Sequence, residues 1–314
     1  MTTAVLVLAR TLHIGSAMML VALPWFVLMV VRPVLREHWG DDGRSFCRSL
    51  VKWLWLALVL EAVSGVAWFW LVTAQMSDRS PWGILGADDL KTVLWQTQFG
   101  RLWFGRAFLG AALVAALSFV SYQQTLSKAG TSLTNWLFLV LSGSLLLTLA
   151  WAGHAAAGIH DAVLHLLADL LHLLLGAIWP TGLVPLACFL LHINDRTRQI
   201  LTPDRSIQVL QRFSHFSLVA VIALLATGSI NAWLMIGSWD ALATTTYGRL
   251  LLGKIFVVGI MIGLGAINRI YLLPKMKDAP IMLRVLEWTV WAESGLALIV
   301  LVIVGVMGTT SPPS

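Results

Sequence analysis

Eight long apolar runs are the feature of this sequence that most restricts its fold. Each is long enough to cross the roughly 30 Å hydrocarbon layer of a bilayer, which takes about 20 helical residues. We expect them near residues 4–31, 51–75, 100–122, 133–153, 163–192, 213–236, 248–273 and 287–308. Backbone polar groups in lipid must be satisfied within the segment, which favours helices. The sequence therefore predicts an all-α integral membrane protein with eight transmembrane helices.

The composition excludes a water-soluble protein. Charged residues make up 11% of the chain and apolar residues 58%, whereas soluble domains carry about 25% charged residues. The two cysteines, Cys47 and Cys188, exclude a disulfide framework and a thiolate metal cage. The first apolar run reaches Val31 without a basic start, too long for the core of a signal peptide, so we expect it to be retained as a span.

Most basic residues fall in three of the connecting loops. They follow spans 1, 5 and 7: Arg32, Arg36, Arg44, Arg48, Lys52, Arg196, Arg198, Arg205, Arg212, Arg269, Lys275, Lys277 and Arg284. The loops after spans 4 and 6 and the C-terminal tail are almost free of lysine and arginine. The positive-inside rule therefore places both termini outside the cytoplasm. The net charge of +6 is thus a topology signal, and we expect the lipid bilayer, not nucleic acid, as a partner.

The sequence also contains an internal duplication. The matching segments are FGRLWFGRAF (99–108) with YGRLLLGKIF (247–256), ARTLH (9–13) with ADLLH (168–172), and Ser64-Gly65 with Thr227-Gly228. We expect two tandem four-helix repeats, residues 1–153 and 154–314, with 76–99 as an outer loop of the first. An even number of spans makes the repeats parallel, which predicts a pseudo-twofold axis along the membrane normal.

Two histidines occupy matching depths inside the membrane. His13 lies roughly ten residues into span 1, and its repeat partner His172 lies at a similar depth in span 5. An ionisable side chain in hydrocarbon costs several kcal/mol unless it is paired or functional. A single histidine on an apolar face is usually a satisfied core residue, but two at equivalent depths favour a functional site.

Span 5 adds further polar residues on the same helical face. His165, Asp169 and His172 follow i, i+4, i+7 spacing, but the two histidines are about 10 Å apart along the axis, too far to chelate one ion together. Asp169 is either a ligand, an acceptor that orients a histidine ring, or the partner of a basic residue in a buried ion pair. His154 and His160 flank the preceding outer loop. Together these side chains predict a histidine-lined opening suited to copper, zinc, iron or nickel.

Five other polar side chains are expected inside the bundle. Arg106 and Lys254 occupy matching positions of the repeated segment, where they either extend to lipid headgroups or pair with a carboxylate or an anionic ligand. Glu61 and Glu293 lie deeper, one in each half, and are candidates to neutralise a basic residue or to relay protons. Asn231 is expected to bridge helices through its amide.

The chain resembles the copper-resistance protein D (CopD) family over most of its length. The residues that carry the resemblance are Gly153-His154-Ala155, Ala168-Asp169, His172, Trp179, Gly182-Leu183, Arg212-Phe213-Ser214, Gly228, Asn231, Tyr247-Gly248, Leu251-Leu252, Lys254, Ala266 and Asn268-Arg269. The family usually has a Gly-Gly pair after the tryptophan, where this chain has Thr181-Gly182, and we expect a changed helix-packing contact there.

The resemblance implies an eight-span bacterial inner-membrane protein that is encoded beside periplasmic copper carriers and moves copper toward the cytoplasm. It also implies His13, His154 and His172 as the copper-handling positions, with copper ions and a periplasmic copper carrier as partners. The sequence contains no Walker motif, so the copper gradient, the membrane potential or protons would drive such transfer. On this interpretation the protein is not an enzyme.

Two alternatives remain open at the level of sequence. Buried histidines in a four-helix unit also hold b-type haem, and each half weakly resembles the HemJ-type oxidases, with His13 and Arg106 or His172 and Lys254 in the corresponding places. In the second alternative, the protein does not transport copper but is a membrane partner of a periplasmic copper carrier. The carrier would dock on loop 76–99 through Asp78, Asp88 and Asp89. The oxidation state of copper and the oligomeric state do not follow from the sequence.

Overall fold

The computed structural model describes residues 2–35, 41–83, 87–125, 132–152, 162–194, 203–276 and 281–310, and within these ranges it is helical, without strands. Eight of its helical segments are long and apolar enough to cross a membrane, which confirms the predicted number. They cover Thr3–Leu35, Ser45–Met76, Gln98–Gln123, Leu133–Trp151, Val163–Ile193, Asp204–Ile236, Thr246–Lys275 and Ile281–Met307.

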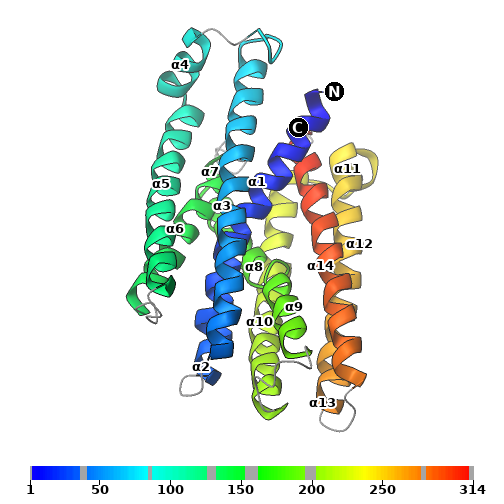
Figure 1. Ribbon diagram of the computed structural model, residues 1–314. Coiled ribbons are helices and arrows are strands. Elements are labelled where there is room, and N and C mark those ends of the chain that lie inside the picture. The colour runs from blue at the N-terminus through cyan, green and yellow to red at the C-terminus, as the bar shows by residue number, and fades with distance from the viewer. Residues whose placement is uncertain are drawn as a thin grey trace.

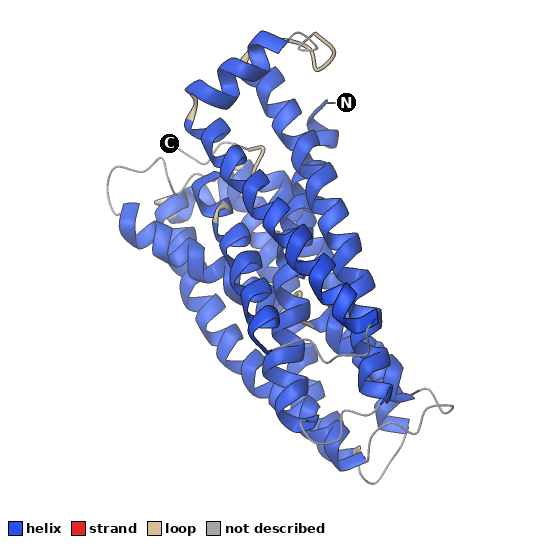
Figure 2. Cartoon of the chain, turned by 60° about the vertical axis from the view of Figure 1, so that its left-hand side comes forward, coloured by secondary structure: helices blue, strands red, loops and turns tan. Residues whose placement is uncertain are grey.

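The helices assemble into a single elongated bundle (Figures 1 and 2). The elements in chain order are α1 (Thr2–Trp25), the π-helix η1 (Phe26–Val31), α2 (Arg32–Leu35), α3 (Asp41–Met76), α4 (Ala87–Gln96), α5 (Gln98–Thr125), α6 (Ser132–Leu147), α7 (Leu149–Ala152), α8 (Ala162–Ile178), α9 (Leu183–Asn194), α10 (Pro203–Ile236), α11 (Trp239–Thr244), α12 (Thr246–Ile267), the π-helix η3 (Asn268–Leu272), α13 (Leu273–Lys275) and α14 (Ile281–Met307).

Both chain ends lie at the same end of the bundle as α4 and α11, at the top of Figure 1. The opposite end carries α2, α9 and α13, and with them the described basic residues Arg32 and Lys275. Arg32 and Lys275, from two of the loops predicted to face the cytoplasm, thus lie at the end away from the termini. Helix α4 forms in the polar segment 76–99, where the sequence predicted an outer loop. The carboxylate of Asp89 pairs there with Arg79 at 2.9 Å.

Spans 1 and 5 form the centre of the bundle. Within their most apolar stretches 67% and 61% of the residues are buried, against 11% for the sixth span and 6% for the seventh. Helix α1 packs against α3, α6, α8 and α14. An apolar helix surrounded by other helices is a core helix, whereas the sixth and seventh spans present most of their surface to lipid.

A cluster of aromatic side chains joins the two halves near the α2 end. The Phe26 ring at the start of η1 packs against Phe189 of α9 at 6.3 Å and Phe213 of α10 at 5.9 Å between centroids. Trp25 contacts Phe216 of α10 at 5.3 Å. Edge-to-face pairs at these separations are favourable beyond the area that they bury. They fix the first span against the second half of the chain.

The fifth span, predicted near residues 163–192, is one crossing segment made of two helices. Helix α8 ends at Ile178 and α9 begins at Leu183. Pro180 lacks an N–H and its ring collides with the carbonyl four residues earlier, so the α-helical ladder cannot continue. The backbone N–H of Thr181 instead donates to the Gly176 carbonyl, five residues back. The Thr181 hydroxyl donates to the Met18 sulfur of α1 at 3.7 Å, a packing contact at the position where the sequence departs from the Gly-Gly pattern.

Candidate functional site

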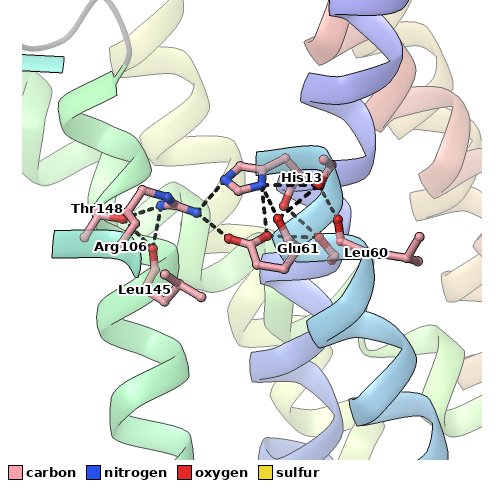
Figure 3. Close-up of polar contacts among 8 residues, drawn as sticks. His13, Leu60, Glu61, Arg106, Leu145 and Thr148 are labelled. Atoms are coloured by element: carbon pink, nitrogen blue, oxygen red, sulfur yellow. Dashed lines mark hydrogen bonds and ion pairs between the residues drawn. The ribbon is translucent and has the colours of Figure 1, made fainter. Parts of the chain in front are cut away.

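The described part of the first half contains a buried cluster of three ionisable side chains. His13 of α1, Glu61 of α3 and Arg106 of α5 point toward one another between these helices (Figure 3). Their exposed fractions are 1%, 7% and 4%. Charged groups so far from water are stable only when each one is paired and hydrogen-bonded, and this cluster meets that condition.

Arg106 is the cation of the cluster. Its Nη2 donates to Glu61 Oε1 at 2.5 Å and lies 2.6 Å from His13 Nε2. Its Nη1 donates to the Leu145 carbonyl at 2.9 Å and to the Thr148 hydroxyl, both at the end of the fourth span. The sequence left open whether Arg106 extends to lipid headgroups or pairs with a carboxylate, and the structure shows the carboxylate pair.

The hydrogen bonds of the His13 ring define its tautomer. Nδ1 lies 3.1 Å from the Glu61 carbonyl oxygen, which can only accept, so Nδ1 carries the proton. The Ser64 hydroxyl, 3.3 Å from Nδ1, donates its own proton to the Leu60 carbonyl and therefore accepts from the ring. Nε2 then holds the lone pair, and Arg106 donates to it. In this arrangement both nitrogens of His13 are engaged.

Aromatic side chains close the space around His13. The Trp68 ring of α3 meets it edge-on at 5.3 Å and the Trp103 ring of α5 lies 5.1 Å away. Gly65 faces the histidine, and a Cβ there would lie 3.0 Å from His13 Cε1 and 3.0 Å from the Trp103 ring. A larger residue at this place would press on both rings, which explains the small residue beside Ser64.

His172 of α8 shares a hydroxyl partner and a facing glycine with His13. Its Nδ1 lies 3.0 Å from the Thr227 hydroxyl of α10, and that hydroxyl donates to the Ala223 carbonyl at 2.8 Å. Thr227 therefore accepts from Nδ1–H and leaves the lone pair on Nε2. Gly228 faces the ring, with a Cβ position 3.2 Å from His172 Cε1. No described residue hydrogen-bonds Nε2 of His172, in contrast to His13.

Lys254 of α12 is the charged group that acts on His172. Lys254 of α12 interacts electrostatically with both Asp169 and His172, and Asp169 also interacts with Tyr247. The first-half counterpart of Asp169 is Arg10, whose guanidinium lies 4.7 Å above the Trp68 ring. The two halves thus share the histidine, the hydroxyl and the glycine but differ in the charges around them. The glutamate position of the first half, Glu61, is an apolar leucine in the second.

The remaining predicted copper ligands are only partly among the residues that the structure describes. His154 and His160 lie outside the described residues. His165 is half-buried on α8, and no group of three histidine, cysteine, aspartate or glutamate side chains in metal-binding geometry occurs among the residues that the structure describes. No hydrogen bond or ion pair between described residues joins His13 to His172. The combined site stays a prediction.

Glu293 of α14 is buried apart from both histidines. Its exposed fraction is 1%, and its Oε1 accepts from Asn268 Nδ2 at 2.5 Å, while the Thr289 hydroxyl donates to Asn268 Oδ1 at 2.7 Å. Asn268 therefore links η3 to α14. The Asn231 amide oxygen, expected to bridge helices, is buried without a hydrogen-bond partner among the described residues.

The comparison with known proteins gives the family. Residues 1–166 match the family described as copper resistance protein D-like, N-terminal domain, and residues 207–307 match copper resistance protein D. The chain belongs to the copper resistance protein D family. No solved structure matches it.

Three curated relatives of this family member span most of its length. It is 30% identical to copper resistance protein D of Pseudomonas syringae pv. tomato over 82% of this chain and 81% of the relative. It is 32% identical to inner membrane protein YebZ of Escherichia coli over 74% of this chain and 75% of the relative. It is 30% identical to copper transport protein CutJ of Bacillus subtilis over 72% of this chain, but it covers only 39% of that longer protein. None of the three names describes an enzyme.

At His13 the donor set of this family member does not support the b-type haem alternative. An axial haem ligand needs a free imidazole nitrogen, and Arg106 occupies Nε2 of His13. The same contact keeps His13 from binding a metal ion while Arg106 stays in place. His172 is thus the better candidate ligand of the two.

Sequence reasoning missed the residues that orient the two histidines. Ser64 and Thr227 entered the argument as repeat markers, yet their hydroxyls determine which ring nitrogen is free. Trp68 and Trp103, which enclose His13, were not selected. The sequence does contain a pattern that marks these residues, because a hydroxyl residue followed by glycine occurs at matching places in both halves. The role of the hydroxyl could be recognised only once the orientation of the histidine rings was known.

Proposed function

We propose that this protein binds copper ions at a histidine site open toward the periplasm and moves them across the inner membrane toward the cytoplasm. Membership of the copper resistance protein D family supports copper as the substrate. The name of the relative CutJ supports transport, and the name of the relative YebZ supports the inner membrane as the location.

The observation that carries the proposal is the orientation of His172. Thr227 holds its Nδ1–H, which directs the lone pair of Nε2 away from α10 and leaves it available for a metal ion. A neutral imidazole with its other nitrogen held by a hydrogen bond is the usual form of a metal-binding histidine. Copper accepts imidazole in both oxidation states that occur in proteins.

In this proposal copper reaches His172 from the outer side. His154, His160 and His165 provide the entry ligands, and Asp169 supplies negative charge beside His172 that offsets the nearby Lys254. His13 becomes a ligand only when Arg106 leaves its Nε2. Arg106 thus acts as a tethered cation that fills the first-half site until a metal ion replaces it.

The matched surroundings of the two histidines support the tandem repeat, with units at 1–153 and 154–314. In each half the ring rests on a glycine, and its Nδ1 is bound by the preceding serine or threonine. The position of spans 1 and 5 at the centre of the bundle supports a pseudo-twofold axis along the membrane normal. Such an axis would place His13 and His172 at comparable depths in the membrane, each about three helical turns from the start of α1 or α8.

The basic end of the bundle supports a cytoplasmic location for α2, α9 and α13, and therefore periplasmic termini. The outer segment 76–99 then faces the periplasm, with Asp78 and Asp88 exposed. These acids make the segment a docking surface for a periplasmic copper carrier.

Copper binding by the full-length protein in detergent tests the proposal. Elemental analysis after loading with Cu(I) should find copper in the wild type, and His172→Ala should lose it while remaining monodisperse. His215→Ala is the matched control, because His215 is exposed on α10 and bonds its own helix at Gln211. Equal copper content in wild type and His172→Ala would contradict the proposed site, and iron near one per chain would favour haem instead.

A further inference from the structure

A crevice separate from both histidines opens in the second half of the protein. It has a cavity volume of about 70 Å³. It lies between the junction of α8 and α9, α10, the junction of α12 and η3, and α14. Most of its wall is apolar, including Trp179 and Phe213. Its polar lining comes from Ser217, Asn268, Arg269 and Glu293, together with Ser214. None of these residues takes part in the copper site.

Two interruptions of regular helix border this crevice. Trp179 and Leu183 flank the break between α8 and α9, and Asn268 and Arg269 open the π-helix η3. Non-helical backbone at membrane depth is tolerated only where it is buried in protein or lines a cavity that admits water or ions. Ion sites of transporters lie at such broken helices, and π-helical turns are frequent at functional sites. The two interruptions meet at one cavity.

The crevice contains a carboxylate that is only partly satisfied. Glu293 is 1% exposed, and its Oε1 accepts from Asn268. No hydrogen bond from a described residue reaches its Oε2. Thr289 donates to the amide oxygen of Asn268 and so directs the amide nitrogen at the carboxylate. An isolated carboxylate in such surroundings is costly as an anion and requires a proton or a cation.

The other polar groups of the described crevice lining do not supply the positive charge that the Glu293 carboxylate requires. Ser217 Oγ is buried without a hydrogen-bond partner among the described residues. Arg269, the other charged residue of the lining, directs its Nη1 to the carbonyl and hydroxyl oxygens of Ser214 at 2.8 and 2.7 Å, and no ion pair joins it to Glu293 among the described contacts. The lining residues from α9 are apolar, Leu183 and Leu186.

We propose that the Glu293 crevice binds a small hard monovalent cation, a proton or a sodium ion, whose movement is coupled to that of copper. Carboxylate and hydroxyl oxygens favour hard cations, whereas copper prefers the imidazoles of the other site. Arg269 belongs to η3, which runs directly into α13 at the basic end of the bundle (Figure 1). The crevice is therefore nearer to the cytoplasmic side under the proposed topology. The coupling rests on the proposed copper transport, but the binding of the cation does not.

Binding is tested first, on the full-length protein without copper. Infrared difference spectra recorded on a pH titration and on a sodium chloride titration should show a carboxyl band that responds to one of the two cations. Glu293→Gln should remove that band. Ser217→Ala breaks no hydrogen bond within the described residues, so it should keep the fold yet weaken the response about fivefold, the value of one hydrogen bond. Glu287→Gln, on the same helix but outside the crevice lining, is the control.

Coupling is tested with the same variants in phosphatidylethanolamine–phosphatidylglycerol vesicles. Copper uptake by the wild type should respond to an imposed pH gradient or sodium gradient, and Glu293→Gln should lose that response while it still binds copper. A carboxyl band that ignores both cations, or that persists in Glu293→Gln, overturns the cation site. Copper uptake that ignores both gradients overturns the coupling. A normal Glu293 band without any copper uptake would instead contradict the proposed transport function.

Discussion

Arg106 is the residue on which the polar interior of the first half depends. It neutralises Glu61, donates to the free nitrogen of His13 and binds the end of the fourth span. A buried ion pair adds little net stability relative to apolar residues, but removal of one partner leaves an uncompensated charge in a medium of low dielectric constant. The contacts of Arg106 therefore make Glu61 essential even if it never binds a metal ion.

Loss of Glu61 should destabilise the protein more than loss of the whole pair. Glu61→Gln is expected to lower the free energy of unfolding by about 3–5 kcal/mol, because Arg106 stays buried without its anion. The double variant Glu61→Gln/Arg106→Gln should regain much of that loss. Thermal unfolding in detergent, followed by tryptophan fluorescence, measures both, with the exposed Arg249→Gln as control. Additive effects of the two substitutions would show that the pair is not coupled.

The hydroxyl of Thr227 should set the copper affinity of His172. Thr227→Val removes the group that holds Nδ1, and loss of such an orienting partner typically lowers metal affinity by about 10–100-fold. Thr227→Ser should keep most of the affinity. Competition with a chromogenic Cu(I) chelator measures the change. Thr244→Val is the control, since Thr244 likewise bonds a carbonyl of its own helix but is exposed on α11. Wild-type affinity in Thr227→Val would contradict the proposed role of the hydroxyl.

At the scale of elements, the break in the fifth span positions the second half. Pro180 ends the α-helical ladder, and the chain turns tightly before α9 begins. At Gly182 a Cβ would lie 2.1 Å from the Ile178 carbonyl oxygen and 3.2 Å from the Phe213 ring. The turn therefore admits only glycine in this geometry, and it places Trp179 and Leu183 on the wall of the crevice.

Gly182→Ala should open this turn. We expect a loss of about 1–3 kcal/mol in the free energy of unfolding, because backbone atoms must shift to admit the methyl group. Gly253→Ala on α12 is the matched control, since a Cβ there meets nothing within 4 Å. The midpoint of thermal unfolding measures both variants. Unchanged stability in Gly182→Ala would mean that the turn is less restricted than the contacts indicate.

At the scale of the whole molecule, both termini share one end of the bundle and the basic helix ends share the other. The termini must share one end because the number of spans is even. By the positive-inside rule, the end that carries the basic residues is the one expected to face the cytoplasm. The repeat boundaries and the pseudo-twofold axis stay predictions. The difference in burial between spans 1 and 5 and the peripheral spans agrees with two halves that meet through their first helices.

Reporter fusions test the orientation of the chain. Alkaline phosphatase fused after Ser314 should be active, because the enzyme folds only outside the cytoplasm, and green fluorescent protein at the same place should be dark. Fusion after Met276, at the end of the seventh span, should give the reverse result. An active phosphatase at Met276 with a fluorescent fusion at Ser314 would invert the topology and turn the crevice toward the periplasm.

The sequence by itself determined the membrane class, the eight spans, the charged end of the bundle and the family. These properties follow from local hydropathy, from loop charge and from motif order, which do not depend on how the helices pack. It also identified His13, Glu61, Arg106 and Glu293 as buried polar residues worth attention.

Only the tertiary structure decided which of these groups meet. Arg106 occupies the lone pair of His13, while His172 has no such partner among the described residues, and Glu293 lies in a crevice of its own. Lipid and helix interiors are equally apolar, so hydropathy says little about which face of a membrane helix turns inward. That choice depends on side-chain packing and interhelical hydrogen bonds between residues far apart in the chain, and these contacts exist only in the assembled bundle.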